Sequence, residues 1–222
     1  EWNKLNEHHT PHLSGKRQDM ATDPQARLLA PSMVYSLCAD EIVNRLKLAQ
    51  PGAIKAMLER DWDITDREGL LRQIYSLLRV GDREDFAGLR ERCQKKSWVE
   101  YEIARLNKTA DSSTEDWERR WRIRRFLDND RGIQTLDFAA WDLIRAANLT
   151  RAGAGQGWLS EDEAWDTLAV INRALQSSYS SWEETWEAFR ITRWLWAAEG
   201  DAQTANNDLH DRNRGEFLVG KN

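Results

Sequence analysis

Histidine and cysteine are scarce in this chain, and their positions restrict the chemistry that it can perform. The histidines are His8, His9, His12 and His210, which leaves residues 13–209 without one. A Ser-His or Cys-His nucleophile would therefore have to recruit a histidine from one end of the chain. Cys38 and Cys93 are too few for a disulfide framework in 222 residues. We interpret them as ordinary thiols of a reducing compartment.

The three histidines near the N-terminus have the composition of a group that could bind a metal through imidazoles. Pro11 interrupts the helical spacing that would bring His8, His9 and His12 to one side of a helix. No second group of acidic residues accompanies them. We interpret this group as solvated and expect neither a metal nor a cofactor.

Proline and strand-like patterns are also missing from most of the chain. The last proline is Pro51, and a proline inside a helix removes a donor and clashes with the preceding turn. No stretch alternates apolar and polar residues with enrichment in β-branched side chains. The sequence therefore predicts an all-α fold, a single compact domain of about eight helices. The predicted helices cover residues 31–49, 52–60, 66–79, 83–107, 115–128, 135–149, 161–176 and 182–199.

Helix-start signals and polar segments indicate how this domain is organised. Thr65, Ser160 and Ser181 are each followed three residues later by glutamate, the pattern of a capping box. The polar segment 109–114 predicts a connector. The expected organisation is a polar lead-in, a helical domain and a polar tail, over residues 1–25, 26–200 and 201–222.

Neither charge sign dominates, and long apolar runs are missing. The 32 Lys and Arg residues and the 37 Asp and Glu residues give a net charge of -5. General nucleic-acid binding, which a strongly basic domain favours, is not predicted. No run approaches the roughly 18 apolar residues of a membrane span, and residues 1–19 lack the apolar segment of a signal peptide. We expect a cytoplasmic protein without a membrane partner.

Lysine is missing from residues 109–220, so carboxylates are the best candidates for chemistry in that half. Paired carboxylates can hydrolyse glycosides or hold a hard cation. Asp137 and Asp142 are the candidates that we single out. Asp142 also lies three residues before Arg145, a spacing that predicts an ion pair on one helix face. We interpret four further acidic residues as first-turn residues that complement a helix dipole; they are Glu161, Asp162, Glu163 and Asp166.

Three glycines in the same half invite comparison with a phosphate-binding loop. Gly153, Gly155 and Gly157 follow a predicted helix rather than a strand, and no Gly-Lys-Ser/Thr ending follows them. We therefore interpret them as the end of that helix.

Tryptophan, in contrast, is abundant, with twelve residues, and many indoles adjoin arginine. In EDWERRWRIRR (115–125), Trp117 and Trp121 are four residues apart, which predicts an amphipathic helix with indoles inward and arginines outward. Arginine also stacks favourably on indole. The side chains that we expect to meet a partner are Trp117, Arg120, Trp121, Arg124, Asp142, Arg145, Arg193 and Trp194.

Three phrases in order resemble a known bacterial family. They are DWDITDREGLLRQIYSLLRVGDREDF (61–86), AAWDLIRAANLTRAGAGQGWLSEDEAW (139–165) and YSSWEETWEAFRITRWLW (179–196). Together they are similar to the domain-of-unknown-function family number twelve sixty-six, of the YbeU and YbeR type. Thr192 departs from the pattern, which has glycine before Arg193. The resemblance implies a helical bacterial protein and brings no catalytic residues with it.

The sequence favours a non-enzymatic protein that binds another protein. Its most specific form, suggested by analogy with relatives, is an immunity protein that neutralises a secreted bacterial toxin. The alternative is a carboxylate-dependent enzyme or metal-binding protein that uses Asp137 and Asp142. A weaker alternative is RNA binding through residues 117–125.

Overall fold

Every regular element in the described part of the chain is helical. The computed structural model describes residues 24–38, 41–48 and 50–198. The longer helices are α3 (Pro51–Trp62), α4 (Arg67–Arg79), α5 (Gly81–Cys93), α6 (Lys96–Leu106), α7 (Thr114–Asp128), α8 (Ala139–Gly155), α9 (Glu161–Ser178) and α10 (Trp182–Ala197). The shorter elements are α1 (Pro24–Arg27), η2 (Ala30–Ser32), α2 (Met33–Cys38) and η3 (Asp130–Gly132). The predicted all-α fold is confirmed.

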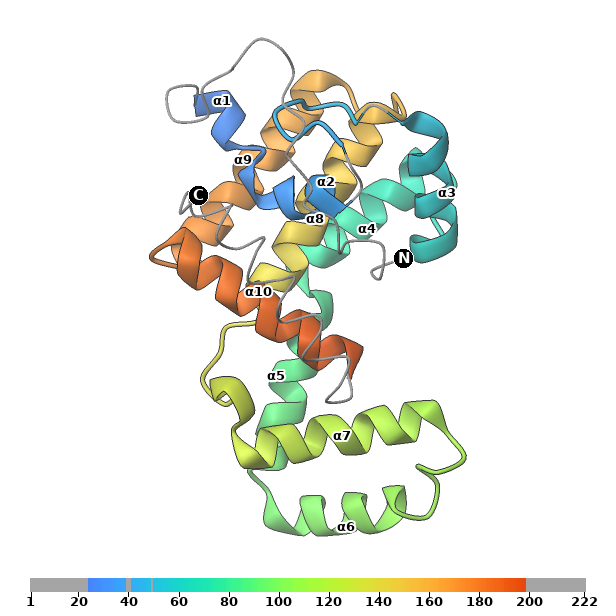
Figure 1. Cartoon of the computed structure of the whole chain (residues 1–222), viewed down its shortest axis with the longest axis vertical. Helices are drawn as coiled ribbons and strands as arrows, with labels where there is room; N and C mark the ends of the chain where they lie inside the picture. The colour runs from blue at the N-terminus through green and yellow to red at the C-terminus, as the bar shows by residue number, and fades with distance from the viewer. Residues whose placement is uncertain (1–23, 39–40, 49, 199–222) are drawn as a thin grey trace.

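Helix α8 forms the centre of the upper part of the molecule and packs against α4, α9 and α10 (Figure 1). Each of its residues from Ala139 to Ala154 is buried. Small side chains allow this, because they let several helices approach one helix at once. A Cβ atom at Gly153 would lie 2.3 Å from a methyl carbon of Leu70 on α4. Glycine is therefore required at position 153 for α4 to pack this closely on α8.

Helices α6 and α7 form a hairpin at the other end of the molecule, and α5 leads to it from α4 (Figure 1). The hairpin nevertheless belongs to the same hydrophobic core. Trp121 of α7 meets Trp194 of α10 with ring centroids 4.9 Å apart. The ring centroid of Phe126 on α7 lies 6.2 Å from that of Phe138, the residue just before α8. The segment 109–114 is therefore a connector inside one domain, as predicted.

The predicted helix 31–49 is wrong beyond Cys38. Helix α2 ends at Cys38, and residues 41–48 are irregular. Arg151 of α8 holds this irregular segment, because its guanidinium donates to the carbonyl oxygens of Ile42, Arg45 and Leu46. These bonds satisfy carbonyl groups that have no helical partner in the observed conformation.

The predicted helix 83–107 is two helices. Helix α5 ends at Cys93, and the extended conformation of Lys95 separates it from α6. Neither glycine nor proline marks this break in the sequence. The break allows α6 to pack against both α5 and α7. Tertiary packing, rather than a local signal, divides the two helices.

The helix starts follow the predicted caps with small shifts. Ser160 and Glu163 form the complete capping box at the start of α9. Ser181 caps α10, although the Glu184 carboxylate accepts from Ser180 instead of from Ser181. Helix α4 is capped by Asp66 rather than by Thr65, because the Asp66 side chain accepts from the Gly69 N–H at 2.8 Å.

The glycine-rich segment after residue 150 is helical for longer than predicted. Gly153 and Gly155 lie inside α8, and Gly157, with φ of 72°, forms the turn that follows. The predicted helix 135–149 is therefore displaced to 139–155. A helix so closely surrounded tolerates glycine, because packing compensates for the low intrinsic helix propensity of this residue.

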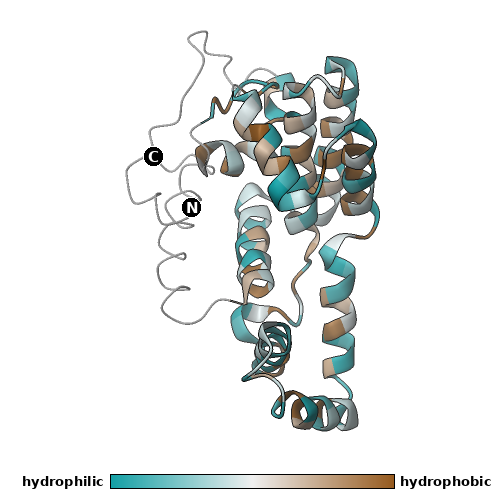
Figure 2. Ribbon diagram, turned by 90° about the vertical axis from the view of Figure 1, so that its right-hand side faces the viewer, coloured by the Kyte–Doolittle hydropathy of each residue, from teal (hydrophilic) through white to brown (hydrophobic). Residues whose placement is uncertain are grey.

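Several predictions fall on residues outside the described ranges. These include His8, His9, His12 and His210, most of the lead-in 1–25 and the tail 201–222. Among the described residues, no helix is both long enough and apolar enough for a membrane crossing. Figure 2 shows hydrophilic and hydrophobic residues mixed along these helices.

Candidate functional site

The start of α5 is held by a side chain from α8. The Asp142 carboxylate is fully buried and accepts the backbone N–H groups of Asp82 and Arg83 at 3.0 and 3.1 Å. These two residues are the second and third of α5, where N–H groups have no partner within the helix. Val80, just before the helix, contributes no side-chain cap. Asp142 therefore caps a helix that begins about 60 residues earlier in the chain.

Arg145 completes the network around this carboxylate. Its guanidinium donates to Asp142 at 2.6 Å, which confirms the predicted ion pair, and to Asp82 at 2.9 Å. It also lies over the rings of Trp141 and Trp62, 4.4 and 5.5 Å from their centroids. The Trp141 indole donates to Asp82 at 3.0 Å. These contacts join α3, α5 and α8 at one buried point.

Burial and pairing act in opposite directions on the charge of Asp142. Loss of hydration raises the pKa of Asp142, because the charged carboxylate is removed from water. The Arg145 guanidinium and the N–H donors of Arg83 and Asp82 offset part of this rise in pKa. The carboxylate is therefore a structural ion-pair partner without direct access to solvent.

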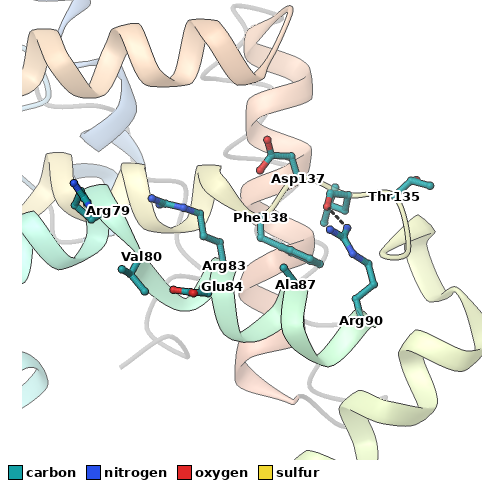
Figure 3. Close-up of a pocket in the computed structure, with 10 residues that line it drawn as sticks. Arg79, Val80, Arg83, Glu84, Ala87, Arg90, Thr135, Asp137 and Phe138 are labelled. Carbon is teal, nitrogen blue, oxygen red and sulfur yellow. Dashed lines mark hydrogen bonds between the residues drawn. The ribbon is translucent and has the colours of Figure 1, made fainter. Parts of the chain in front are cut away.

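A pocket of about 580 Å³ lies on the solvent side of this network (Figure 3). It lies between the end of α4, the first turns of α5 and the segment that leads into α8. Figure 3 shows the Phe138 ring between Arg83 and Arg90, with Arg79 further along α4. The lining residues are Arg79, Val80, Arg83, Glu84, Ala87, Arg90, Thr135, Leu136, Asp137 and Phe138.

Two of the three pocket arginines are held in place by other parts of the protein. Arg83 donates to the carbonyls of Leu77 and Leu78 at 2.8 and 2.7 Å, and to Asp142 at 3.3 Å. Arg90 donates to the Leu136 carbonyl at 2.9 Å. These guanidiniums are therefore oriented before any ligand arrives.

Arg79 differs from the other two arginines. Its guanidinium lies 5.7 Å from the centroid of the Tyr75 ring, one helical turn earlier on α4. Within the described part of the chain it has no hydrogen bond or ion pair. The same holds for Glu84 on the facing turn of α5. The pocket thus offers one unpaired donor group and one unpaired acceptor group.

The carboxylates considered for catalysis lie in different environments. Asp137 borders the pocket, and its carboxylate accepts the Ala139 N–H at 2.8 Å. Asp142 is buried in the network below. The acidic residues from 161 to 166 lie at the start of α9, where Glu163 is part of a capping box. Among the described residues, no group of three His, Cys, Asp or Glu side chains is placed to hold a metal ion.

Tyr179 helps to fix the wall of the pocket. Its hydroxyl donates to the Asp137 carbonyl at 2.9 Å and accepts the Ala140 N–H at 2.8 Å. Burial raises the pKa of this hydroxyl, because the phenolate would be poorly solvated. Tyr179 therefore stays neutral and acts as a structural bridge between α8 and the end of α9.

The three indoles predicted to face a partner have different environments. Trp121 and Trp194 are buried against each other, and Arg125 and Arg131 lie over their rings at 4.9 and 4.3 Å. Trp117 is 37% exposed. Of the three indoles, only Trp117 is available to a partner on this surface.

The predicted arginines are similarly divided. Arg145 and Arg193 are buried, whereas Arg124 is exposed. Arg120 donates to Asn107 at 3.3 Å and lies 3.8 Å from Asp111. Four of the five arginines in residues 115–125 have acidic partners inside the protein; these are Arg119, Arg120, Arg122 and Arg125. This neutralisation does not favour an RNA-binding surface.

Sequence reasoning missed Arg151 and the pocket arginines. Arg151 is fully buried and donates to Ser32 and Ser36 as well as to the backbone carbonyls of residues 42–46. Desolvation lowers its pKa to about 10. The sequence feature that could have indicated the burial of Arg151 is its position among small residues in a helix without lysine. Nothing local in the sequence groups Arg79, Arg83 and Arg90 around one pocket.

Comparison with known proteins places the chain in a family. Residues 57–217 match the family described as "Protein of unknown function (DUF1266)". The uncharacterized protein YbeR of Escherichia coli (strain K12) is 29% identical over 154 residues, which cover 65% of this chain and 58% of YbeR. The uncharacterized protein YbeU of the same strain is 29% identical over 153 residues, which cover 63% of this chain and 56% of YbeU.

The chain thus matches somewhat more than half the length of these curated relatives. No solved structure matches it. The three phrases that suggested the resemblance all lie inside the matched residues, and they supply α4, α8 and α10 around the network of Asp142. On this match, the chain belongs to the DUF1266 family.

Proposed function

We propose that this protein acts by binding another protein and performs no reaction itself. The observation that carries the proposal is an exposed apolar stripe of Leu71 and Tyr75 on α4, which leads at the same four-residue spacing to Arg79 at the rim of the pocket. Leu71 and Tyr75 expose 41% and 61% of their surface, and Val80, just after the helix, exposes 46%. Val80 and Arg79 also line the pocket. Apolar and aromatic residues beside arginine are typical of protein interfaces.

The surroundings support the use of this surface for recognition. The helix that carries the stripe packs on α8 through Leu70 and Ile74, which are buried. Arg83 and Arg90 are held by carbonyl oxygens, and Arg83 also by Asp142. A backbone and a pocket wall fixed in this way lose little conformational entropy on binding, which favours affinity.

The outer side of α7 is a second exposed surface. Trp117 and Arg124 are exposed there, and both were expected to meet a partner. Tyr101 on α6 is 70% exposed on the same hairpin. We assign the main contact to the α4 stripe, because it is continuous with the pocket that Arg79 lines.

The more specific form of the proposal is an immunity-type role, in which the partner is a bacterial toxin and binding covers its active site. An aromatic and an arginine carried on a helix that packs on α8 support the role of a tight inhibitor, because a fixed backbone reduces the entropy lost on binding. Co-expression with the product of a neighbouring gene tests this form. The neighbouring gene should arrest growth alone and cease to do so with this protein. Continued growth arrest would contradict the immunity role.

Capture of the partner tests the general proposal. The affinity-tagged full chain is expressed in the bacterium that carries its gene, and bound proteins are identified by mass spectrometry. The wild type should retain one protein in near-stoichiometric amount, and Tyr75→Ala should lose it. Tyr101→Ala is the matched control, because it removes an exposed tyrosine from the hairpin instead of the stripe. Equal capture by Tyr75→Ala, or no stoichiometric partner, would contradict the proposal.

A further inference from the structure

We infer that the pocket beside α4 binds the carboxylate of an acidic side chain in an extended segment of the partner protein, with Arg79 as the residue that pairs with it. This inference rests on the proposed function and names the chemistry of the partner. It follows from three features of the pocket. They are the different hydrogen bonding of its three arginines, the apolar stripe beside it and the position of Glu84.

The three pocket arginines differ in how many of their N–H groups remain available to a ligand. Arg83 and Arg90 use N–H groups on the carbonyls of Leu77, Leu78 and Leu136. These bonds fix the positions of Arg83 and Arg90 in the wall of the pocket. Arg79 has only the Tyr75 ring as a neighbouring partner in the described part of the chain. Its guanidinium fork is therefore free for a carboxylate, the group that arginine binds in bidentate geometry.

The apolar stripe determines what accompanies the carboxylate. Tyr75 and Arg79 are four residues apart on α4, a rise of about 6 Å along a helix. Alternate residues of an extended segment point to the same side and are about 6.6 Å apart. A segment with an apolar residue two positions from an acidic residue therefore matches Tyr75 and Arg79 together. The inference predicts an apolar-x-Asp/Glu pattern, in either direction.

Glu84 leads to a second prediction, in which a substitution tightens the binding of an acidic segment instead of weakening it. It lies on the pocket wall without a hydrogen bond or ion pair among the described residues. Its carboxylate repels an incoming acidic group while still able to accept an N–H from the ligand backbone. Glu84→Gln removes the repulsion and keeps an acceptor oxygen. Binding of an acidic segment should therefore become a few-fold tighter in this variant.

A phage-displayed library of random dodecapeptides, selected on the immobilised full chain, is the probe. Display through the peptide C-terminus leaves no free terminal carboxylate, so selected acidity must come from side chains. Enriched sequences are synthesised with blocked ends, and their affinity is measured by fluorescence anisotropy. Amide-substituted copies, and neutral copies with a free C-terminus, distinguish a side-chain carboxylate from a terminal one.

The expected result is enrichment of the apolar-x-acidic pattern and a loss of affinity of at least about tenfold in Arg79→Gln. Arg72→Gln is the matched control, because Arg72 lies on the same helix and pairs with Glu68 at the exposed surface. It should change affinity by less than about twofold. The inference is overturned if no sequence is enriched, if amide substitution leaves affinity unchanged, or if Arg79→Gln binds as well as the wild type.

Repeating the capture experiment with Arg79→Gln separates the inference from the proposal on which it rests. If the full chain captures a partner from cells and Arg79→Gln captures it equally, protein binding stands and the role of Arg79 fails. If the wild type captures no partner, the proposed function itself fails. A neutral peptide with a free C-terminus that binds through Arg79 would replace the acidic side chain by a terminal carboxylate and overturn the inference as stated.

Discussion

The carboxylate of Asp142 occupies the space that a side chain at Gly81 would need. An ideal Cβ atom at Gly81 would lie 2.0 Å from Oδ2 of Asp142. Gly81 also has φ of 60°, in the left-handed region that other residues seldom adopt. Position 81 therefore joins α4 to α5 and admits the cap from α8 at the same time. This relationship leads to the first two predictions.

Gly81→Ala should lower the free energy of unfolding by about 2 kcal/mol or more, because it adds backbone strain and a clash with Asp142. The measurement is chemical denaturation followed by circular dichroism. Gly52→Ala, at the start of α3, is the control, since nothing lies within 4 Å of a Cβ atom there. It should leave stability unchanged or raise it by a few tenths of a kcal/mol. Equal stability of the two variants would contradict the described geometry.

Asp142→Asn should destabilise the fold by about 3 kcal/mol, because it removes one charge from a buried pair and weakens the cap of α5. Asp162→Asn, on the exposed first turn of α9, should change stability by less than about 0.5 kcal/mol. A double-mutant cycle with Arg145→Met measures the pair itself. Additive effects of the two substitutions would show that the two residues are not coupled.

Arg151→Lys should destabilise the protein by about 2–4 kcal/mol, because one ammonium group cannot reach the serine hydroxyls and the separate carbonyls that the guanidinium bonds. Hydrogen exchange should accelerate in residues 41–48 before it does in α9. Arg173→Lys on α9 is an exposed control with a similar change. Unchanged exchange in residues 41–48 would show that Arg151 does not hold this segment.

Trp121→Ala and Trp117→Ala should differ in stability, because Trp121 is a core indole and Trp117 is a surface indole on the same helix. Trp121 packs against Trp194 and Arg125, so its loss should cost about 3–5 kcal/mol of stability. Trp117 is partly exposed and should cost less than about 1 kcal/mol. Thermal unfolding of both variants is sufficient to measure the contrast. Similar losses for both would contradict the described orientation of α7.

Glu163 should make the stability depend on pH in acid. A hydrogen bond from Arg67 and the capping bonds with Ser160 lower its pKa from 4.5 to about 2. A carboxylate with a lowered pKa in the folded state stabilises the fold above its unfolded pKa. This stabilisation is lost as the pH falls from about 4.5 to about 2. The stability difference between wild type and Glu163→Gln should therefore shrink between pH 6 and pH 3. A stability difference between the two proteins that does not change with pH would contradict this role of Glu163.

The predictable part of the fold rests on short-range rules. The ion pair of Asp142 with Arg145 follows from a spacing of three residues in a helix, and the capping box of Ser160 from a similar spacing. The cap of α4 lies one residue later than predicted, at Asp66 instead of Thr65, and both residue types are adequate caps. Such shifts are small because the helices themselves are set by nearby residues.

The candidate site was less predictable, because its members come from distant parts of the chain. Asp142 and Arg145 were identified as an ion pair, but their contact with the start of α5 joins residues about 60 positions apart. Arg79 and Glu84 carry no special pattern in the sequence. They matter because α4, α5 and the segment before α8 enclose one pocket.

By itself, the sequence determined the helical class, most helix starts and the pairing of neighbouring charges on α8. Those properties depend on side chains within one or two turns of each other, where spacing and capping chemistry act directly. Only the tertiary structure decided which indoles are buried, which carbonyls of residues 42–46 bond to Arg151, and that Arg79 borders the pocket with no hydrogen bond or ion pair in the described part of the chain. These outcomes depend on which distant segments compete for the same carbonyls, charges and volume, and that competition is settled only when the helices pack.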